Sequence, residues 1–191
     1  MLQSFIKTMP DSDLKLKIGS VKLFISDVDG VLTDGSIYIS SDGQESKRFS
    51  VEDGAGAALA HLSRLPVAFI SGRYSEASAI RLKEMRIEHV FQGSLNKTIP
   101  FEHLLQIFNL TPKQVAYMGD GLVDIPVMER CGFKIAPPNS HPLVLKLADY
   151  ITNSRGGFGA FREAVEIILK GQDKYDDVLA NMKEKIYLKN S

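Results

Sequence analysis

The chain has 191 residues, and 23 Lys and Arg residues balance 23 Asp and Glu residues, so its formal net charge is zero. A balanced charge gives no global electrostatic reason to bind nucleic acid or an anionic membrane, and we expect neither partner. No segment approaches the ~20 apolar residues of a membrane-spanning helix, and residues 1–19 lack the apolar core of a secretion signal. A single cysteine, Cys131, excludes an internal disulfide and fits a reducing compartment, so we expect a cytoplasmic protein.

The lead-in and the first core strand differ in pattern. In the lead-in, three apolar residues alternate with lysines, which favours a short edge strand: Leu14, Leu16 and Ile18. An apolar run from Val21 to Ile25 then predicts a buried core strand over 21–26. Beyond it, two strand-like runs surround Asp42-Gly43 and predict a β-hairpin over 36–50, which could lean over the end of the core strand as a flap.

Strands and helices alternate through the rest of the chain. Further strands are predicted at 66–70, 88–91, 114–118, 133–136 and 150–152. Helices are predicted at 53–64, 75–86, 97–109, 123–130, 141–148 and 160–170, and the charged tail over 173–191 has helical character and is expected to be exposed or packed on a neighbour. This alternation predicts an α/β fold, a single domain over 1–191 with a Rossmann-like parallel sheet and helices on both faces.

Two aspartates, Asp27 and Asp29, follow the first core strand. Residues two apart in an extended segment point the same way, so both can converge on one point where the strand ends. Close carboxylates tolerate each other best around a shared cation or proton, and all-oxygen ligation suits magnesium. An Asp-rich turn after a strand is the plainer alternative.

Polar residues also follow three later strands. They are Ser71 with Gly72 and Arg73, then Lys97 at a helix start, then Asp120 with Asp124 one helical turn later. In a parallel sheet these strand ends lie on one edge. A metal site, a hydroxyl, a lysine and the backbone amides that glycines leave accessible can together cradle a phosphate there. Each residue alone has a structural alternative as a turn residue, a helix cap or a surface charge, and their joint order favours the phosphate site.

This order resembles the four motifs of the haloacid dehalogenase-like phosphohydrolases. The matching stretches are Asp27-Val28-Asp29-Gly30-Val31-Leu32-Thr33, Ser71, Lys97 and Gly119-Asp120-Gly121-Leu122-Val123-Asp124. The resemblance implies that Asp27 attacks phosphorus and forms an aspartyl-phosphate. It also implies that Asp29 protonates the leaving group and then activates the water that hydrolyses the intermediate.

The same resemblance implies a ligand set. Mg²⁺ would be held by the carboxylates of Asp27 and Asp120 and by the backbone carbonyl of Asp29. Ser71 and Lys97 would hold the phosphoryl oxygens. Asp124 would stand behind them, near Lys97.

Within that superfamily the chain resembles the 3-deoxy-D-manno-octulosonate 8-phosphate phosphatases. The similarity lies in Thr33-Asp34-Gly35, Phe49 to Gly56, Ser71-Gly72-Arg73, Gln92-Gly93, Gly156-Gly157-Phe158-Gly159-Ala160 and Arg162-Glu163. It implies a capless enzyme that acts as a homotetramer on a phosphorylated eight-carbon sugar acid. Arg73 and Arg81 match arginines of that family and would bind the substrate carboxylate, with a helix-surface charge as the alternative for Arg81.

Gly121 departs from the resemblance, because that family usually has a second aspartate there. Phosphatases of nonulosonate 9-phosphates are the nearest competitor, although they tend to lack an arginine at the position of Arg73. A receiver-like phospho-acceptor also places aspartates and a lysine at a sheet edge, but it predicts no acid/base partner such as Asp29. A catalytically weak tetramer that serves as a scaffold is a further alternative.

Overall fold

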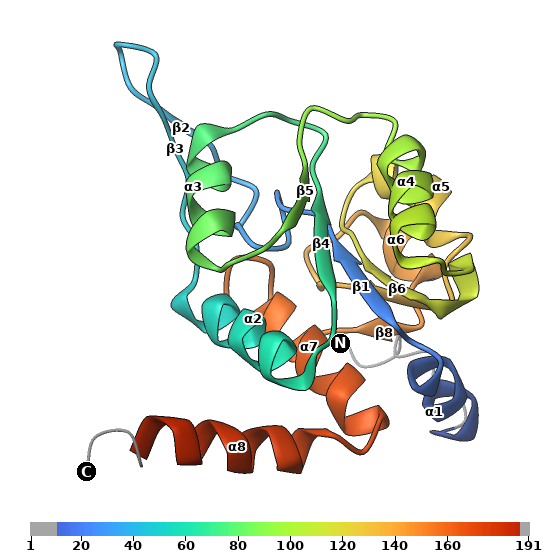
Figure 1. Cartoon of the computed structure of the whole chain (residues 1–191). Coiled ribbons are helices and arrows are strands. Elements are labelled where there is room, and N and C mark those ends of the chain that lie inside the picture. Colours follow the sequence, from blue (N-terminus) through green and yellow to red (C-terminus); the bar gives the residue numbers. More distant parts are fainter. Residues whose placement is uncertain (1–10, 188–191) are drawn as a thin grey trace, which may run out of the picture.

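The computed structural model describes residues 11–187, and a six-stranded parallel sheet runs through its centre (Figure 1). The strand order is β5-β4-β1-β6-β7-β8. The bounds are β1 Leu23–Ser26, β4 Val67–Ile70, β5 His89–Phe91, β6 Val115–Met118, β7 Phe133–Ala136 and β8 Tyr150–Ile151. From β1 the strands follow outward as β4 and β5 on one side and as β6, β7 and β8 on the other. The carboxyl end of β1 is therefore a switch point of the kind at which α/β sheets bind ligands.

Helices cover both faces of the sheet (Figure 1). One face carries α2 Val51–Ser63, α3 Glu76–Glu84 and α7 Ala160–Gly171, with α1 Asp11–Gly19 and α8 Tyr175–Tyr187 packed against α7. The other face carries α4 Thr98–Phe108, α5 Ile125–Met128 and α6 Pro142–Leu147. Short 3-10 turns, η1 Pro112–Gln114 and η2 Leu122–Asp124, precede β6 and α5. The predicted fold class is confirmed.

Strand β1 is buried on both faces. Phe24 packs in the core that includes α2 and α7, whereas Leu23 and Ile25 pack in the core that includes α4 and α5. The Phe24 ring stacks on Phe161 of α7, with 5.3 Å between the ring centroids. Burial on both faces explains the unbroken apolar run of this strand, and it confines the polar residues to the carboxyl end.

The predicted hairpin lies between β1 and α2. Its strands, β2 Tyr38–Ile39 and β3 Glu45–Ser46, are antiparallel, and the hairpin projects beyond α3 at the top of Figure 1. Gly43 in its turn has a φ of +84°, which glycine adopts without strain. Between β1 and β4 the chain has only this hairpin and α2, which leaves no large cap domain there.

The edge strand predicted in the lead-in is wrong, because these residues form α1. Leu14 and Ile18 are four residues apart, so they share one face of the helix and pack toward the core. Leu16 lies off that face and is 75% exposed. A spacing of two and a spacing of four coincide over so short a segment, and packing against α7 decides for the helix.

The helical character predicted for the tail is confirmed by α8. This helix packs on α2 and α7 of its own chain, with Val178 buried in the contact. The final residues of the predicted tail, 188–191, lie outside the described residues.

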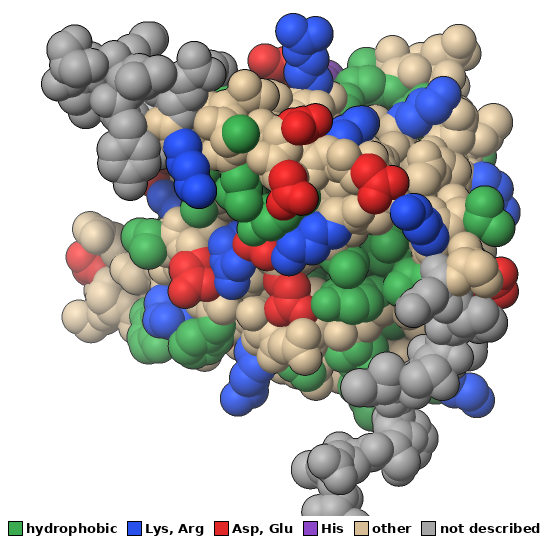
Figure 2. All heavy atoms as spheres, turned by 90° about the horizontal axis from the view of Figure 1, so that it is seen from below, with side chains coloured by type: hydrophobic (Ala, Val, Ile, Leu, Met, Phe, Trp, Pro, Cys, Tyr) green, Lys and Arg blue, Asp and Glu red, His purple; other side chains and the backbone are tan. Residues whose placement is uncertain are grey.

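The face opposite the hairpin mixes charges of both signs. Figure 2 shows Lys and Arg side chains among Asp and Glu side chains across it, as the zero net charge predicts. Within residues 11–187, no helix is both long enough and apolar enough to cross a membrane.

Helices α2 and α7 approach closely. A Cβ at Gly56 would lie 2.7 Å from Cα of Arg162, so glycine is required there. Asp53, in the first turn of α2, is buried and accepts a hydrogen bond of 3.2 Å from the backbone N–H of Arg162. Burial raises the pKa of Asp53 to about 6, although the N–H groups at the start of α7 oppose the shift.

This burial makes stability depend on pH. The ordinary pKa of the Asp53 carboxyl is 3.8, so the unfolded chain ionises first as pH rises. The contribution of Asp53 to the free energy of unfolding therefore falls between about pH 4 and pH 6, by up to about 3 kcal/mol, and stays low above that range. Asp53→Asn removes this fall, so we expect the variant to gain stability relative to the parent as pH rises from about 4 to about 6.

Urea unfolding of both proteins at several pH values in that range measures the difference. The control Asp177→Asn removes an exposed carboxylate from α8 and reports the effect of losing one charge. A difference in the free energy of unfolding between the Asp53 variant and its parent that stays constant with pH would contradict the prediction.

Candidate active site

The predicted site residues Asp27, Ser71, Lys97 and Asp120 follow β1, β4, β5 and β6 at one edge of the sheet. Strands β4 and β6 pair with β1 on its two sides, so Ser71 and Asp120 flank the switch point at Asp27. The ladder continues to Asp27, whose N–H donates to the carbonyl of Met118 at 2.9 Å. The backbone of Asp27 is thereby fixed to β6.

Lys97 joins two of the aspartates. Its side chain is fully buried, and Nζ lies 2.8 Å from Oδ1 of Asp27 and 2.7 Å from Oδ1 of Asp124. Burial alone would lower the pKa of Lys97, but the charges of Asp27 and Asp124 outweigh it and raise the pKa. The lysine therefore carries a fixed positive charge beside the carboxylate of Asp27, whose Oδ1 also accepts from the N–H of Val28 at 2.7 Å.

Asp124 holds this lysine in place. It is fully buried, and Oδ1 accepts from Nζ of Lys97 and from the hydroxyl of Tyr117, both at 2.7 Å. Oδ2 accepts from the N–H groups of Asp120 at 3.1 Å and Gly121 at 2.9 Å. Four hydrogen bonds occupy both oxygens, so Asp124 fixes its neighbours in place.

Asp120 completes a cluster of carboxylates. One ligand atom from each of Asp27, Asp120 and Asp124 lies within 4.8 Å of the others. Burial and then the charge of Asp124 raise the pKa of Asp27 to about 8 and that of Asp120 to about 7. A Cβ at Gly30 would lie 2.0 Å from Oδ2 of Asp120, so glycine leaves the room that this carboxylate needs.

The donor set of this cluster fits a magnesium ion. Its side-chain donors are all oxygen, the preference of a hard cation that usually takes one or two carboxylates and keeps several waters. The raised pKa values of Asp27 and Asp120 mark carboxylates crowded together in a buried site, which a divalent cation would stabilise. Asp27 and Asp120 are the residues to hold it, because the oxygens of Asp124 are already occupied.

The carboxylate of Asp29 lies outside this cluster. Its Oδ1 is 2.6 Å from Nζ of Lys47, whose side chain is fully buried and also lies 3.3 Å from the hydroxyl of Ser78. The two aspartates thus take different partners, Asp27 with Lys97 and Asp29 with Lys47. Each of the two carboxylates is therefore held by its own buried lysine.

Ser71 and Arg73 lie at the end of β4. Ser71 is buried, and its hydroxyl donates to the carbonyl of Arg73 at 2.9 Å and accepts from the Arg73 N–H at 3.2 Å. The guanidinium of Arg73 lies 2.8 Å from Oε2 of Glu45 on the hairpin. Gly72 between them leaves room for Leu95, which a Cβ would meet at 3.3 Å.

Arg81 lies farther from the aspartates, on α3. It donates to the carbonyl of Ser50 at 3.1 Å and to Oε2 of Glu84 at 3.2 Å. Its Nε is buried without a hydrogen-bond partner among the described residues. In this chain Arg81 thus ties α3 to the base of the hairpin, and its part in binding a substrate stays a prediction.

Sequence reasoning missed Lys47, Glu45 and Tyr117. The two hairpin residues carry no local signal, because their partners come from β1 and β4. Tyr117 had a usable signal, since a tyrosine inside a buried strand needs a partner for its hydroxyl. Burial and then the charge of Asp124 raise the pKa of Tyr117, so it stays a donor.

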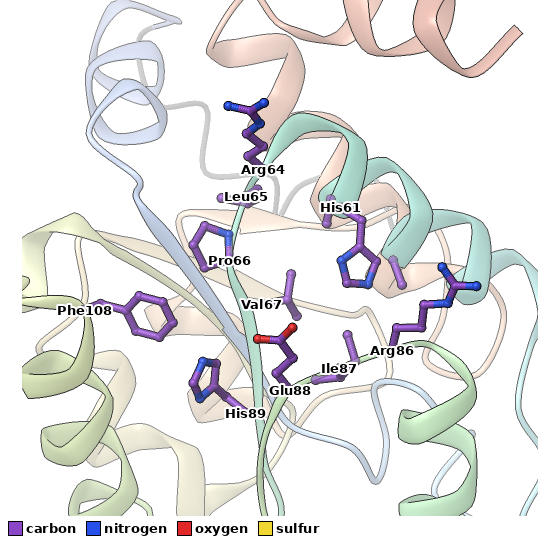
Figure 3. Close-up of a pocket in the computed structure, with 12 residues that line it drawn as sticks. His61, Arg64, Leu65, Pro66, Val67, Arg86, Ile87, Glu88, His89 and Phe108 are labelled. Atoms are coloured by element: carbon purple, nitrogen blue, oxygen red, sulfur yellow. The ribbon is translucent and has the colours of Figure 1, made fainter. Parts of the chain in front are cut away.

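A hollow of about 270 Å³ lies away from this site, between α2 and β5 (Figure 3). Figure 3 shows His61, Glu88 and His89 around it, and the guanidinium of Arg64 extends away from it. His61 is already bonded to the carbonyl of Met85 at 3.1 Å. The hollow adjoins the amino ends of β4 and β5, opposite the aspartates, so it is not the candidate active site.

Comparison with known proteins gives the same picture. The haloacid dehalogenase-like hydrolase family matches residues 61–160. The 3-deoxy-D-manno-octulosonate 8-phosphate phosphatase KdsC of Escherichia coli K12 is 43% identical over 166 residues, covering 87% of this chain and 88% of the relative. KdsC of Salmonella typhi is 44% identical over 161 residues, covering 84% and 86%.

Two solved structures are similar to this chain over most of its length. The 3-deoxy-D-manno-octulosonate 8-phosphate phosphatase of Yersinia pestis has a TM-score of 0.83 and 40% identity, covering 86% of this chain and 89% of its own. The Moraxella catarrhalis phosphatase of the same name, in complex with magnesium, phosphate and KDO, has a TM-score of 0.86 and 37% identity, covering 90% and 98%.

The bond from Tyr117 to Asp124 supports a prediction. Tyr117→Phe removes one of the four hydrogen bonds of a buried carboxylate, which should cost about 1–2 kcal/mol of stability. Because Asp124 also fixes Lys97, we expect turnover of a phosphomonoester to fall about tenfold.

Tyr150→Phe is the matched control, because its hydroxyl donates to Oε1 of Glu163 at 2.9 Å, away from the site. Urea unfolding and phosphate release are measured on both variants. Equal losses of activity in the two would show that Tyr117 serves stability alone.

Proposed function

The chain belongs to the haloacid dehalogenase-like hydrolases, and from that membership we propose that it is a magnesium-dependent phosphatase of 3-deoxy-D-manno-octulosonate 8-phosphate. It would release the free sugar acid and phosphate. The observation that carries the proposal is the buried pairing of Lys97 with Asp27, beside Asp120 and Asp124. Such a site presents a fixed carboxylate nucleophile among groups that can balance a phosphate.

Asp27 is the nucleophile in this mechanism. Lys97 and the N–H of Val28 both hold Oδ1, which leaves Oδ2 to attack phosphorus. A P–O bond forms to Asp27 as the bond to the sugar oxygen breaks, giving an aspartyl-phosphate. Nζ of Lys97 and the hydroxyl of Ser71 lie at the edge of the sheet where they can bind the phosphoryl oxygens.

Asp29 moves the protons. In its protonated form it gives a proton to the departing sugar oxygen, and the resulting carboxylate takes a proton from the water that attacks the aspartyl-phosphate. The P–O bond to Asp27 breaks, which regenerates the Asp27 carboxylate and releases inorganic phosphate, and Asp29 is protonated again. Lys47, 2.6 Å from Asp29, fixes the carboxylate in position for both steps.

Magnesium bound by Asp27, Asp120 and the Asp29 carbonyl would offset the negative charge that the nucleophile and the phosphate bring together. The solved Moraxella catarrhalis phosphatase binds magnesium together with phosphate and KDO, which supports this assignment.

The sugar-acid substrate is supported by the names of the relatives and by Arg73. Arg73 follows Ser71 at the end of β4, and its half-exposed guanidinium lies against Glu45 of the hairpin, where a carboxylate on a bound sugar could reach it. The same arginine favours an octulosonate over a nonulosonate 9-phosphate, whose phosphatases tend to lack it.

We also propose that the enzyme is a homotetramer in the cytoplasm. The hairpin exposes Tyr38 and Ile39, at 56% and 68%, and exposed apolar side chains on a projecting element mark an interaction site. Cys131, the one cysteine, is buried as a free thiol, which suits a reducing compartment.

Substitution of the two aspartates tests the mechanism. Asp27→Asn removes the nucleophile and Asp29→Asn removes the acid and base, so we expect phosphate release to fall at least about 1,000-fold in each. Asp34→Asn, in the same segment, is the control, because the side chain of Asp34 caps the local turn by accepting from the N–H of Ser36 at 2.9 Å.

The variants are assayed with magnesium on octulosonate 8-phosphate, nonulosonate 9-phosphate and simple sugar phosphates. Preference for nonulosonate 9-phosphate would keep the mechanism and overturn the substrate. Equal phosphorylation of the parent and of Asp29→Asn, with no phosphate turnover by the parent, would favour a receiver-like acceptor. A parent that is neither phosphorylated nor active would favour the scaffold.

The tetramer has its own test. Ile39→Lys places a charge in the exposed apolar part of the hairpin, so we expect it to shift the protein from tetramer to smaller species. Light scattering coupled to size-exclusion chromatography measures the mass. Lys113→Glu, in η1 at the amino end of β6 and away from the hairpin, is the control. A parent that is monomeric at micromolar concentration would refute the proposal.

A further inference from the structure

Four side chains of alternating charge form a series of contacts from Asp29 to the half-exposed Arg73. Asp29 pairs with Lys47 at 2.6 Å, Lys47 lies 3.7 Å from Oε1 of Glu45, and Oε2 of Glu45 pairs with Arg73 at 2.8 Å. The chain of contacts begins at the proposed acid and base and ends at the proposed ligand of the substrate carboxylate. Glu45 is its central member and has no part in the mechanism above.

The position of Glu45 follows from the hairpin. Glu45 lies on β3, and Lys47 follows two residues later, so both side chains leave the same face of the extended segment. That face lies against α3, through Ser78, and against the end of β4, through Arg73. Glu45 thereby links the flap to the strand that carries Ser71.

The guanidinium of Arg73 is only partly used by this contact. The side chain is 53% exposed, and one nitrogen donates to Glu45. A guanidinium has five N–H donors in a planar fork, so other donors remain for a second carboxylate. An arginine already held by one carboxylate loses less conformational freedom when it binds another.

We propose that Glu45 is a positioning residue for substrate specificity, which holds Arg73 so that its free donors face the carboxylate of the sugar acid. This inference rests on the proposed function, since it assumes a substrate with a carboxylate. Glu45 would then contribute to the recognition of sugar acids without touching the reacting atoms.

The surroundings of Glu45 suit this role. The hydroxyl of Ser75, and then the charges of Lys47 and Arg73, hold the pKa of Glu45 below its ordinary value, so it stays ionised near neutral pH. Its Oε1 is buried without a hydrogen-bond partner among the described residues, and Lys47 is the nearby charge that stabilises it. A carboxylate held between two cations has little freedom to release Arg73.

The opposite role would be competition, in which Glu45 occupies Arg73 until a substrate displaces it. The two roles predict opposite signs. If Glu45 positions Arg73, its loss weakens the binding of a carboxylated substrate. If it competes, its loss strengthens that binding.

The experiment compares Glu45→Gln with the parent on two substrates, octulosonate 8-phosphate and p-nitrophenyl phosphate, which has no carboxylate. We expect KM for the sugar acid to rise about tenfold with kcat within about twofold, and kcat/KM for p-nitrophenyl phosphate to stay within about twofold. Glu45→Asp, which keeps the charge, should recover part of the loss. Glu45→Gln added to Arg73→Met should have no further effect, because both act through one contact.

The control is Glu102→Gln, which breaks a Glu–Arg pair with Arg130 on the opposite face of the sheet. A lower KM for the sugar acid in Glu45→Gln would overturn the proposal in favour of competition. Equal losses on both substrates would overturn it in favour of support for Lys47 and Asp29. A parent that does not prefer the carboxylated substrate would instead refute the proposed function, whatever Glu45→Gln does.

Discussion

The site depends on one buried positive charge. Lys97 lies between Asp27 and Asp124, with no solvent exposure of its side chain. Burying an ammonium group costs several kcal/mol unless charged partners and hydrogen bonds replace water, and removing a partner leaves an uncompensated charge. The two short contacts meet this requirement and fix the carboxylate of Asp27, the proposed nucleophile. The bonds that stabilise the buried lysine are therefore the same bonds that hold Asp27 in the proposed mechanism.

Other features of this edge of the sheet follow from that requirement. Asp124 can hold Lys97 only if its remaining acceptor sites are filled, and Tyr117 and the N–H groups of Asp120 and Gly121 fill them. Gly119 must lack a side chain, because a Cβ there would lie 2.4 Å from Cγ of Asp124. The fourth motif is thus a backbone arrangement built around one carboxylate.

This dependence explains which parts of the site could be predicted. Asp27, Lys97 and Asp120 follow strands, and parallel strands bring their carboxyl ends to one edge whatever the loops do. Lys47 and Glu45 could not be found this way, because the hairpin lies over β1 and β4 only through tertiary contacts. The prediction of an edge strand in the lead-in failed for a related reason. The sequence there fits both a strand period and a helix period, and the packing of α1 on α7 decides for the helix.

Gly121 shows how a departure in a motif can be judged by geometry. Its φ of −107° suits any residue, and a Cβ there would lie no closer than 3.7 Å to a neighbouring atom. What the position contributes is its N–H, which donates to Asp124 at 2.9 Å. An aspartate there would keep that bond and add a negative charge beside Asp120, whose pKa burial and Asp124 already raise to about 7. Compared with an aspartate, glycine at this position preserves the hold on Asp124 and Lys97 and lowers the repulsion at the proposed metal site, which is consistent with a working phosphatase.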